Sequence, residues 1–144
     1  MKKNGLVQEL FISVKGQGRR NQDNLELDEN GVCSDKFYGK NPNRAILLTS
    51  NDSYLLAKEN NIEAEYGSLG ENILMDINPY SLKVGDRLSI GEVELEITHN
   101  CTICNSLAKV DPKLPKLLEH DRGVFAKTIK NGTIKKGDIV TLAL

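Results

Sequence analysis

The sequence of 144 residues predicts a mainly β fold, a barrel-like mixed β-sheet with two or so short helices. Apolar and polar residues alternate over residues 93–98, which is the period of a strand with one buried face. Several other short runs rich in β-forming residues are separated by glycines, and only two segments have the spacing of a helix. We expect one domain over residues 1–144, because a chain of this size can hold a single core.

The predicted strands, in chain order, occupy residues 5–14, 25–28, 45–49, 93–98, 125–129 and 139–144. The first strand ends at a basic loop that contains glycine, residues 15–20. Residues 82–90 and 134–142 both contain Lys-x-Gly-Asp followed by alternating apolar residues. Each copy predicts a tight turn that leads into a strand, with the glycine at positive φ.

Two segments favour helices. Thr49 or Ser50 can cap a first helix that runs to about Asn60. The second predicted helix spans residues 111–123, with Asp111 as its N-cap. Both are short, so strands should supply most of the regular structure.

Charge and hydropathy exclude several classes of function. The 19 Lys and Arg against 20 Asp and Glu give a net charge of −1, too little to attract nucleic acid or an anionic membrane surface. No stretch approaches the roughly 20 apolar residues of a membrane helix, and no export signal precedes the first strand. Three cysteines cannot all pair within one chain, which favours a reducing compartment. We therefore expect a cytoplasmic protein with no nucleic-acid or membrane partner.

One cluster of potentially reactive groups, His-Asn-Cys-Thr-Ile-Cys at residues 99–104, follows a predicted strand directly. Three chemical interpretations stay open, beside that of a buried, inert cysteine. A structural zinc ion could bind His99, Cys101 and Cys104, with Cys33 as the fourth ligand. Cys101 and Cys104 could instead form a dithiol redox pair. Alternatively, Cys104 could act alone as a nucleophile or metal ligand.

Two other features could contact a ligand. Glycines beside an asparagine in residues 67–73 would let the backbone approach a ligand closely, although a turn that positions a core residue fits equally well. The basic residues Lys15, Arg19, Arg20 and Arg44 could hold a phosphate through charge-assisted hydrogen bonds, or could simply be solvated.

Six short motifs follow one another in the chain: Gly70-Glu-Asn-Ile73, Leu82-x-Val-Gly-Asp-Arg-Leu-x-Ile-Gly91, Val93-x-Leu-x-Ile-Thr98 leading into Cys104, Arg122-Gly-Val-x-Ala126, Asn131-Gly132 and Lys136-Gly-Asp138. In this order the sequence resembles the MOSC domain family, named after the molybdenum cofactor sulfurase C-terminal domain. The chain departs from the family in one loop, where Ser34 replaces a glycine and no histidine follows Asp35.

The resemblance implies a small stand-alone MOSC protein with a fold like the pyruvate kinase β-barrel domain. It implies binding of the molybdenum cofactor (molybdopterin), and sulfur transfer or metal-sulfur handling through a loop cysteine. Cys104 takes the family's cysteine position, so it is the expected catalytic residue and, with Cys101, an expected metal ligand. The expected cofactor-binding residues are Gly70, Glu71 and Asn72, which would shape the pocket. Lys15, Arg19 and Arg44 are added to them as phosphate partners because of their charge.

The partners implied by the resemblance are the molybdenum cofactor itself, or the proteins that synthesise and sulfurate it. This domain alone is not expected to bind pyridoxal phosphate, and turnover as a sulfurtransferase-like enzyme stays open. Two alternatives remain. One is a non-catalytic accessory barrel that docks on a molybdoenzyme or a cofactor-synthesis protein. The other is a zinc or redox protein that uses the Cys-x-x-Cys pair of Cys101 and Cys104.

Overall fold

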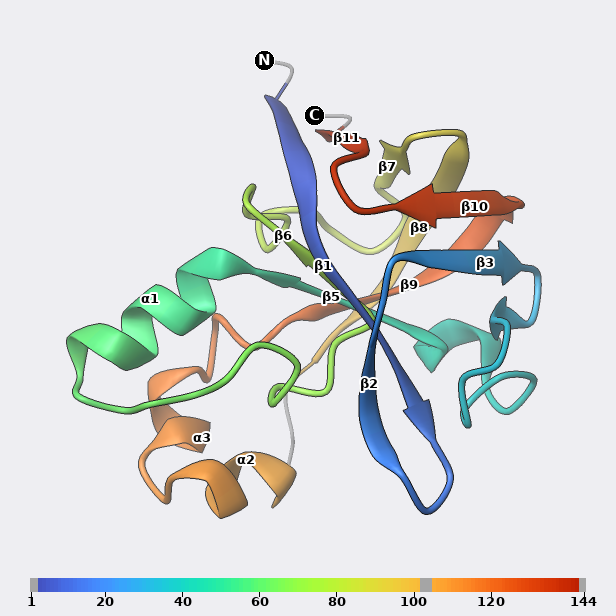
Figure 1. The fold of residues 1–144 in the computed structure, drawn as a ribbon. Coiled ribbons are helices and arrows are strands. Elements are labelled where there is room, and N and C mark those ends of the chain that lie inside the picture. Colours follow the sequence, from blue (N-terminus) through green and yellow to red (C-terminus); the bar gives the residue numbers. More distant parts are fainter. Residues whose placement is uncertain (1–2, 102–104, 143–144) are drawn as a thin grey trace.

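The computed structural model describes residues 3–101 and 105–142 and consists mainly of β-strands (Figure 1). The strands are β1 (Lys3–Val14), β2 (Gly18–Gln22), β3 (Asn24–Asp28), β4 (Gly31–Val32), β5 (Ile46–Ser50), β6 (Ile73–Met75), β7 (Arg87–Ile90), β8 (Val93–Asn100), β9 (Val124–Lys130), β10 (Gly132–Lys135) and β11 (Ile139–Leu142). The helices are the 3₁₀ turn η1 (Pro42–Arg44), α1 (Asn51–Glu59), α2 (Asn105–Val110) and α3 (Leu114–Leu117).

Seven of these strands close into a barrel. They follow one another in the order β11-β7-β8-β9-β5-β6-β1, and β1 pairs again with β11 to complete the wall. Strands β5 and β6 are parallel, whereas the other neighbours in the wall are antiparallel, so the sheet is mixed. Strand β2 extends β1 outside the wall as a hairpin, and β10, β3 and β4 form a second, small sheet. The predicted barrel-like mixed β fold is confirmed.

The period-two pattern of β8 acts as the sequence predicts. Val93, Leu95 and Ile97 are buried inside the barrel, while Glu94 and Glu96 between them are only partly buried. Alternate side chains of a strand point to opposite faces, so one face of β8 contributes to the core and the other meets solvent. Every residue of β5 is buried, which confirms the apolar run at residues 45–49 as a strand covered on both sides.

The two Lys-x-Gly-Asp turns are also confirmed. Gly85 has φ +94° and Gly137 has φ +85°, both in the left-handed region that glycine adopts without a Cβ penalty. Strand β7 starts two residues after the first glycine and β11 starts two residues after the second. The turns therefore deliver two neighbouring strands of the wall, because β7 pairs directly with β11.

The first predicted helix is correct and the second is wrong in extent. Ser50 caps α1, because its hydroxyl accepts a hydrogen bond from the Asp52 amide at 3.0 Å. In the second segment, Asp111 ends α2 rather than starting one long helix. Its carboxylate accepts the Lys113 amide at 2.8 Å in a local turn, and the four-residue α3 begins only at Leu114.

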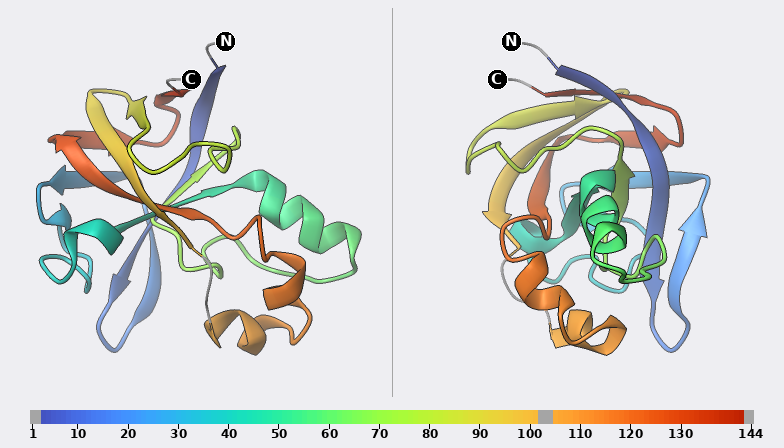
Figure 2. Two further views of the ribbon diagram at one scale, coloured as in Figure 1. Left: turned by 180° about the vertical axis from the view of Figure 1, so that it is seen from behind. Right: turned by 90° about the vertical axis from the view of Figure 1, so that its left-hand side faces the viewer.

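The α-helices α1, α2 and α3 gather on one side of the barrel, and the small sheet and η1 lie on the other (Figures 1 and 2). One apolar cluster fills the barrel, with large side chains such as Leu48, Ile73 and Leu95 fully buried. A second cluster lies beneath the helices. Its buried members are Tyr54, Ala57, Ile62, Leu69, Leu74, Leu107, Leu114 and Leu118. Because Leu74 belongs to β6, this second cluster attaches the helices to the barrel wall.

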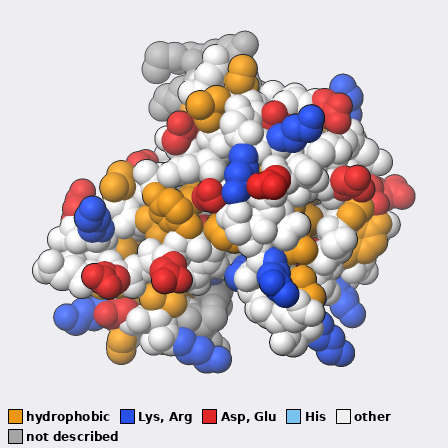
Figure 3. Space-filling model, in the orientation of Figure 1, with side chains coloured by type: hydrophobic (Ala, Val, Ile, Leu, Met, Phe, Trp, Pro, Cys, Tyr) orange, Lys and Arg blue, Asp and Glu red, His pale blue; other side chains and the backbone are white. Residues whose placement is uncertain are grey.

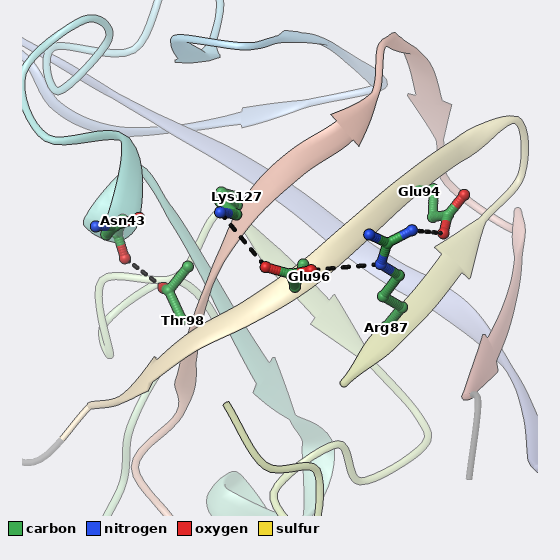
Figure 4. Close-up of polar contacts among 6 residues, drawn as sticks. All are labelled: Asn43, Arg87, Glu94, Glu96, Thr98 and Lys127. Carbon is green, nitrogen blue, oxygen red and sulfur yellow. Dashed lines mark hydrogen bonds and ion pairs between the residues drawn. The ribbon is translucent and has the colours of Figure 1, made fainter. Parts of the chain in front are cut away.

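The outer face of β7 and β8 carries a chain of ion pairs (Figure 4). Arg87 contacts Glu94 at 3.2 Å and Glu96 at 3.3 Å, and Lys127 of β9 contacts Glu96 at 3.4 Å. These side chains are well solvated, so each pair contributes little to stability.

Near these ion pairs, a hydrogen bond connects η1 to the barrel wall. The Thr98 hydroxyl on β8 donates to the carbonyl oxygen of Asn43 (Figure 4). This bond fixes the backbone immediately before Arg44, a residue of the pocket described below.

No helix in the described part of the chain is long and apolar enough to cross a membrane. On the face drawn in Figure 3, basic and acidic side chains are interspersed and do not form large fields of one sign. This mixture agrees with the net charge of −1.

We predict that Leu95→Ala lowers the free energy of unfolding by about 2–5 kcal/mol, because it opens a cavity in the fully buried barrel interior. Denaturant unfolding followed by circular dichroism measures this change. The matched control is Val84→Ala, since Val84 is 71% exposed, and it should change stability by less than about 0.5 kcal/mol. Equal losses for the two variants would contradict the assignment of the core.

Candidate functional site

A pocket of about 670 Å³ is the main candidate site, and its described lining has five cationic side chains and no carboxylate. The lining residues are Ser13, Arg19, Lys36, Phe37, Lys40, Asn41, Arg44, Ala45, Leu47, Gly67, Ser68, Gly70, Asn72, Cys101, Arg122 and Phe125. They come from the β1–β2 hairpin, from β5 and the loop before it, from the loop before β6, from the residue that follows β8, and from the start of β9 and the segment just before it. The pocket therefore forms only where segments far apart in the sequence meet.

Two arginines stand beside Gly70 with hydrogen-bond donors unused. Arg122 is only 4% exposed, and its Nε and Nη1 have no hydrogen-bond partner in the described structure; the same holds for Nη1 of Arg19. Nη2 of Arg19 donates to the Gly70 carbonyl oxygen. A Cβ placed on Gly70 would lie 3.3 Å from Nη2 of Arg19 and 3.8 Å from Nη2 of Arg122. The missing side chain thus avoids a tight contact with the guanidinium of Arg19, while that of Arg122 lies at an ordinary contact distance.

The charge of Arg19 is balanced by buried acids. Burial lowers the pKa of Arg19, and the nearby carboxylates of Glu71 and then Asp35 oppose this shift by attraction. An arginine stays protonated at any physiological pH, so the group remains a cation with free N–H donors. Such buried, unpaired donors are suited to an oxyanion, since charge-assisted hydrogen bonds are among the strongest in proteins.

Aromatic rings lie beside the other cations of the pocket. The guanidinium carbon of Arg44 is 5.0 Å from the centre of the Phe125 ring, and Nζ of Lys36 is 5.0 Å from that of Phe37. Phe37 is 48% exposed, an unusual position for a large apolar ring. Exposed rings next to cations offer a stacking surface to a planar, anionic ligand.

Asn72 lines the pocket but its side chain is fully engaged in the fold. Its Oδ1 accepts the Leu47 amide at 3.0 Å, and its Nδ2 donates to the Phe11 carbonyl oxygen at 3.2 Å and to Asp35 at 3.4 Å. Its backbone bonds to the same two strand residues, with the Leu47 oxygen at 2.9 Å and the Phe11 amide at 2.8 Å. Asn72 therefore joins β5 to β1 and forms a rigid part of the pocket wall.

Glu71 is completely buried and does not line the pocket. Its Oε2 accepts the Tyr54 hydroxyl at 2.5 Å, the Thr49 hydroxyl at 3.2 Å and the Gly67 amide at 3.3 Å. Burial raises the pKa of Tyr54 far above its ordinary value, and the negative charge of Glu71 adds to this shift because it disfavours the tyrosinate anion. Tyr54 thus remains a protonated donor to this carboxylate.

The loop before β5 is ordered by Asp35. One carboxylate oxygen accepts the Ser13 amide at 2.6 Å and the other accepts the Phe37 amide at 3.0 Å. Ser34 precedes it with φ +72°, in the left-handed region that favours glycine. The loop therefore keeps a glycine-like backbone at the position where the sequence has serine.

The cysteines occupy different environments. Cys101 is buried, lines the pocket, and its amide donates to the Gly123 carbonyl oxygen at 2.9 Å. Cys104, the expected catalytic residue, lies outside the described residues. Burial and the neighbouring Asp28 raise the pKa of the Cys33 thiol, which disfavours its reactive thiolate. Over residues 3–101 and 105–142, no three His, Cys, Asp or Glu residues form a group that could hold a metal ion.

The structure brings together part of the predicted set. Arg19, Arg44, Gly70 and Asn72 line one pocket with Cys101, while Glu71 lies behind its wall. Lys15 is exposed in the β1–β2 turn and is not among the lining residues. Arg20, on the neighbouring strand β2, is also exposed, and its guanidinium donates a hydrogen bond to the side chain of Gln17.

Sequence reasoning missed several lining residues, namely Lys36, Phe37, Lys40, Arg122 and Phe125. A signal existed for Arg122, which opens one of the six motifs. Another existed in the loop, where an aromatic pair lies between Lys36 and Lys40. Neither pattern indicates on its own that these segments share a pocket.

The fold and the pocket define a small closed-barrel protein with a cationic site partly lined by aromatic rings. The profile of the MOSC domain matches residues 35–141, most of the chain. The protein therefore belongs to the MOSC domain family, as the resemblance in its motifs indicated.

Solved structures support the same fold. YuaD from Bacillus subtilis superposes with a TM-score of 0.84 at 19% identity, covering 98% of this chain and 96% of that one. YiiM from Escherichia coli gives a TM-score of 0.71 at 20% identity, covering 99% and 70%. YiiM from Geobacillus stearothermophilus gives 0.69 at 14% identity, covering 97% and 73%. A search of curated proteins found no match to the sequence.

We predict that Asn72→Ala lowers the free energy of unfolding by about 3 kcal/mol, because it leaves a buried amide and a buried carbonyl without partners. Chemical unfolding measures the effect. Asn60→Ala is the control, since this exposed side chain makes one bond to the Leu56 carbonyl, and it should cost less than about 1 kcal/mol. A loss of ligand binding without a loss of stability would instead make Asn72 a ligand contact.

Proposed function

We propose that this MOSC domain protein binds molybdopterin, the organic part of the molybdenum cofactor, in the cationic pocket. The observation that carries the proposal is the pair of arginines beside Gly70, the half-buried Arg19 and the buried Arg122, with N–H groups that nothing in the described structure accepts. We also propose that residues 1–144 act as one domain, because the helices and the barrel share a buried apolar cluster.

The residues present fit the chemistry of this cofactor. Arg19 and Arg122 would hold its phosphate through charge-assisted hydrogen bonds. Phe37 and Phe125 offer apolar faces for its pterin ring, with Lys36 and Arg44 beside them. The cofactor, when bound, would supply a molybdenum-sulfur centre, for which a cysteine thiolate is a suitable soft ligand.

We further propose that Cys104 carries sulfur for this pocket. Cys101 lines the pocket wall, and Cys104 follows it by three residues in the chain. The Cys104 thiolate would attack the outer sulfur of a persulfide donor, so that a new S–S bond forms while the donor's own S–S bond breaks. The donor leaves as a thiolate with the electron pair of that bond. Cys101 would then serve as the resolving thiol, which displaces the bound sulfur and forms a reversible disulfide with Cys104.

We predict that Arg19→Gln weakens the binding of molybdopterin by about tenfold or more, because it removes a charged donor from the pocket. Equilibrium dialysis with quantification of the pterin measures the dissociation constant. Arg20→Gln is a closely matched control, since Arg20 is the next residue of the same strand and is exposed. It should bind as the parent does. The proposed site would be contradicted if the two variants weakened binding equally, or if neither variant weakened it.

We predict that the protein, incubated with a low-molecular-weight persulfide, gains the mass of one sulfur atom on Cys104. Peptide mass spectrometry locates the modification. Cys104→Ser should abolish it, whereas Cys33→Ser should not, because the raised pKa of Cys33 makes that thiol a poor nucleophile. Sulfur found on Cys33, or on no cysteine, would remove the sulfur-transfer part of the proposal and leave cofactor binding as a separate question.

A further inference from the structure

Glu71 lies directly behind the pocket wall, between two residues that line it. Gly70 and Asn72 line the pocket, whereas the carboxylate of Glu71 contacts Thr49 and Tyr54 on the other side of the wall. It is fully buried, and its Oε1 has no hydrogen-bond partner in the described structure. A carboxylate this deeply buried is costly unless a nearby positive charge compensates it.

The positive charges nearby are the two arginines of the pocket. Within the described residues, neither Arg19 nor Arg122 makes a side-chain ion pair with a carboxylate. Arg19 nonetheless feels the attraction of Glu71 and Asp35, the two buried acids on this side of the barrel. The acids therefore offset the charge of Arg19 from a distance, without occupying the unpartnered N–H groups of either arginine.

This arrangement differs from an ordinary buried salt bridge. In a bidentate salt bridge the carboxylate takes two of the five N–H donors of the arginine and leaves fewer for a ligand. Here Glu71 uses Tyr54, Thr49 and Gly67 as its donors, and the guanidinium groups keep theirs for the pocket. The unpartnered N–H groups of Arg19 and Arg122 thus have no carboxylate partner that a ligand anion would have to displace.

We propose that Glu71 is a positioning residue that, with Asp35, supplies the resident counter-charge of the Arg19–Arg122 pair and sets the affinity of the pocket for phosphate-bearing ligands. Glu71 stabilises the protein with no ligand bound, and it weakens anion binding because it has already offset part of the positive charge. This inference rests on the proposed function in one respect, namely that the ligand binds in the cationic pocket.

The test compares the parent with Glu71→Gln, using inorganic phosphate as the probe at constant ionic strength and a pH of about 8, where phosphate is mainly a dianion. We expect the variant to unfold at a lower temperature without phosphate, because the half-buried Arg19 and the buried Arg122 lose a counter-charge. We also expect it to bind phosphate about tenfold more tightly in isothermal titration calorimetry, and to gain more thermal stability from phosphate than the parent does.

A purely structural role for Glu71 predicts a different result. In that case stability falls while phosphate affinity stays the same or weakens, and this outcome would overturn the proposal. Thr49→Val is the matched control, because it removes one hydrogen bond to the same carboxylate oxygen and leaves the charge unchanged. It should lower stability without changing phosphate affinity.

Asp35→Asn provides a second route if Glu71→Gln does not fold. It removes the other compensating charge, and we expect it to tighten phosphate binding as well. The absence of saturable phosphate binding in both the parent and the variants would also overturn the proposal. Molybdopterin binding by the parent is measured separately, so a failure of the counter-charge role can be distinguished from a failure of the proposed function.

Discussion

The hydrogen bonds of Asn72 are the constraint on which both the barrel and the pocket depend. At this residue β1 and β5 have no direct pairing, and the amide side chain bridges the gap between the Leu47 amide and the Phe11 carbonyl oxygen. The backbone of Asn72 also forms hydrogen bonds with Leu47 and Phe11, so this one residue connects β5 to β1 through both its backbone and its side chain. Its third side-chain contact reaches Asp35, which orders the loop that carries the pocket lysines. A single side chain therefore couples closure of the wall to the shape of the site.

The segment from Gly67 to Asn72 serves the fold and the site at the same time. Gly67 has φ +92°, and a Cβ there would lie 2.9 Å from the ring of Phe11. Gly70 leaves space for the guanidinium group of Arg19, and Glu71 faces the helices on the other side. Because Glu71 contacts Tyr54 of α1 while Gly70 and Asn72 line the pocket, the helices and the pocket use different residues of this stretch. This sharing explains how so short a segment can combine two glycines, a buried acid and an amide.

Much of the fold follows from local patterns. The alternation in β8, the capped helix α1 and the two Lys-x-Gly-Asp turns are all decided by neighbouring residues, and each was predicted. The second helix was misplaced because Asp111 bonds to the amide two residues later and interrupts the helix. No local pattern distinguishes that turn from an N-cap, since the same side chain forms both.

The site was predictable only where the family motifs pointed to it. Gly70 and Asn72 belong to a motif, and Arg19 and Arg44 were weighed as phosphate partners because of their charge alone. The charge of the two residues could not show that Arg19 lines the pocket and Lys15 does not. This outcome depends on the β1–β2 turn, in which Lys15 is exposed to solvent. Arg122 and Phe125 lie more than a hundred residues from Arg19 in the sequence, and only barrel closure brings them together.

This assembly from distant segments has a consequence for how the protein responds to a bound molecule. The walls of the pocket contain residues of the first hairpin, the loops before β5 and β6, and the ends of β8 and β9. None of these segments presents a binding surface until the barrel is complete, so a ligand has affinity for the folded state alone. Occupancy would therefore oppose global unfolding, and amide hydrogens in strands remote from the pocket would exchange more slowly whenever it is filled.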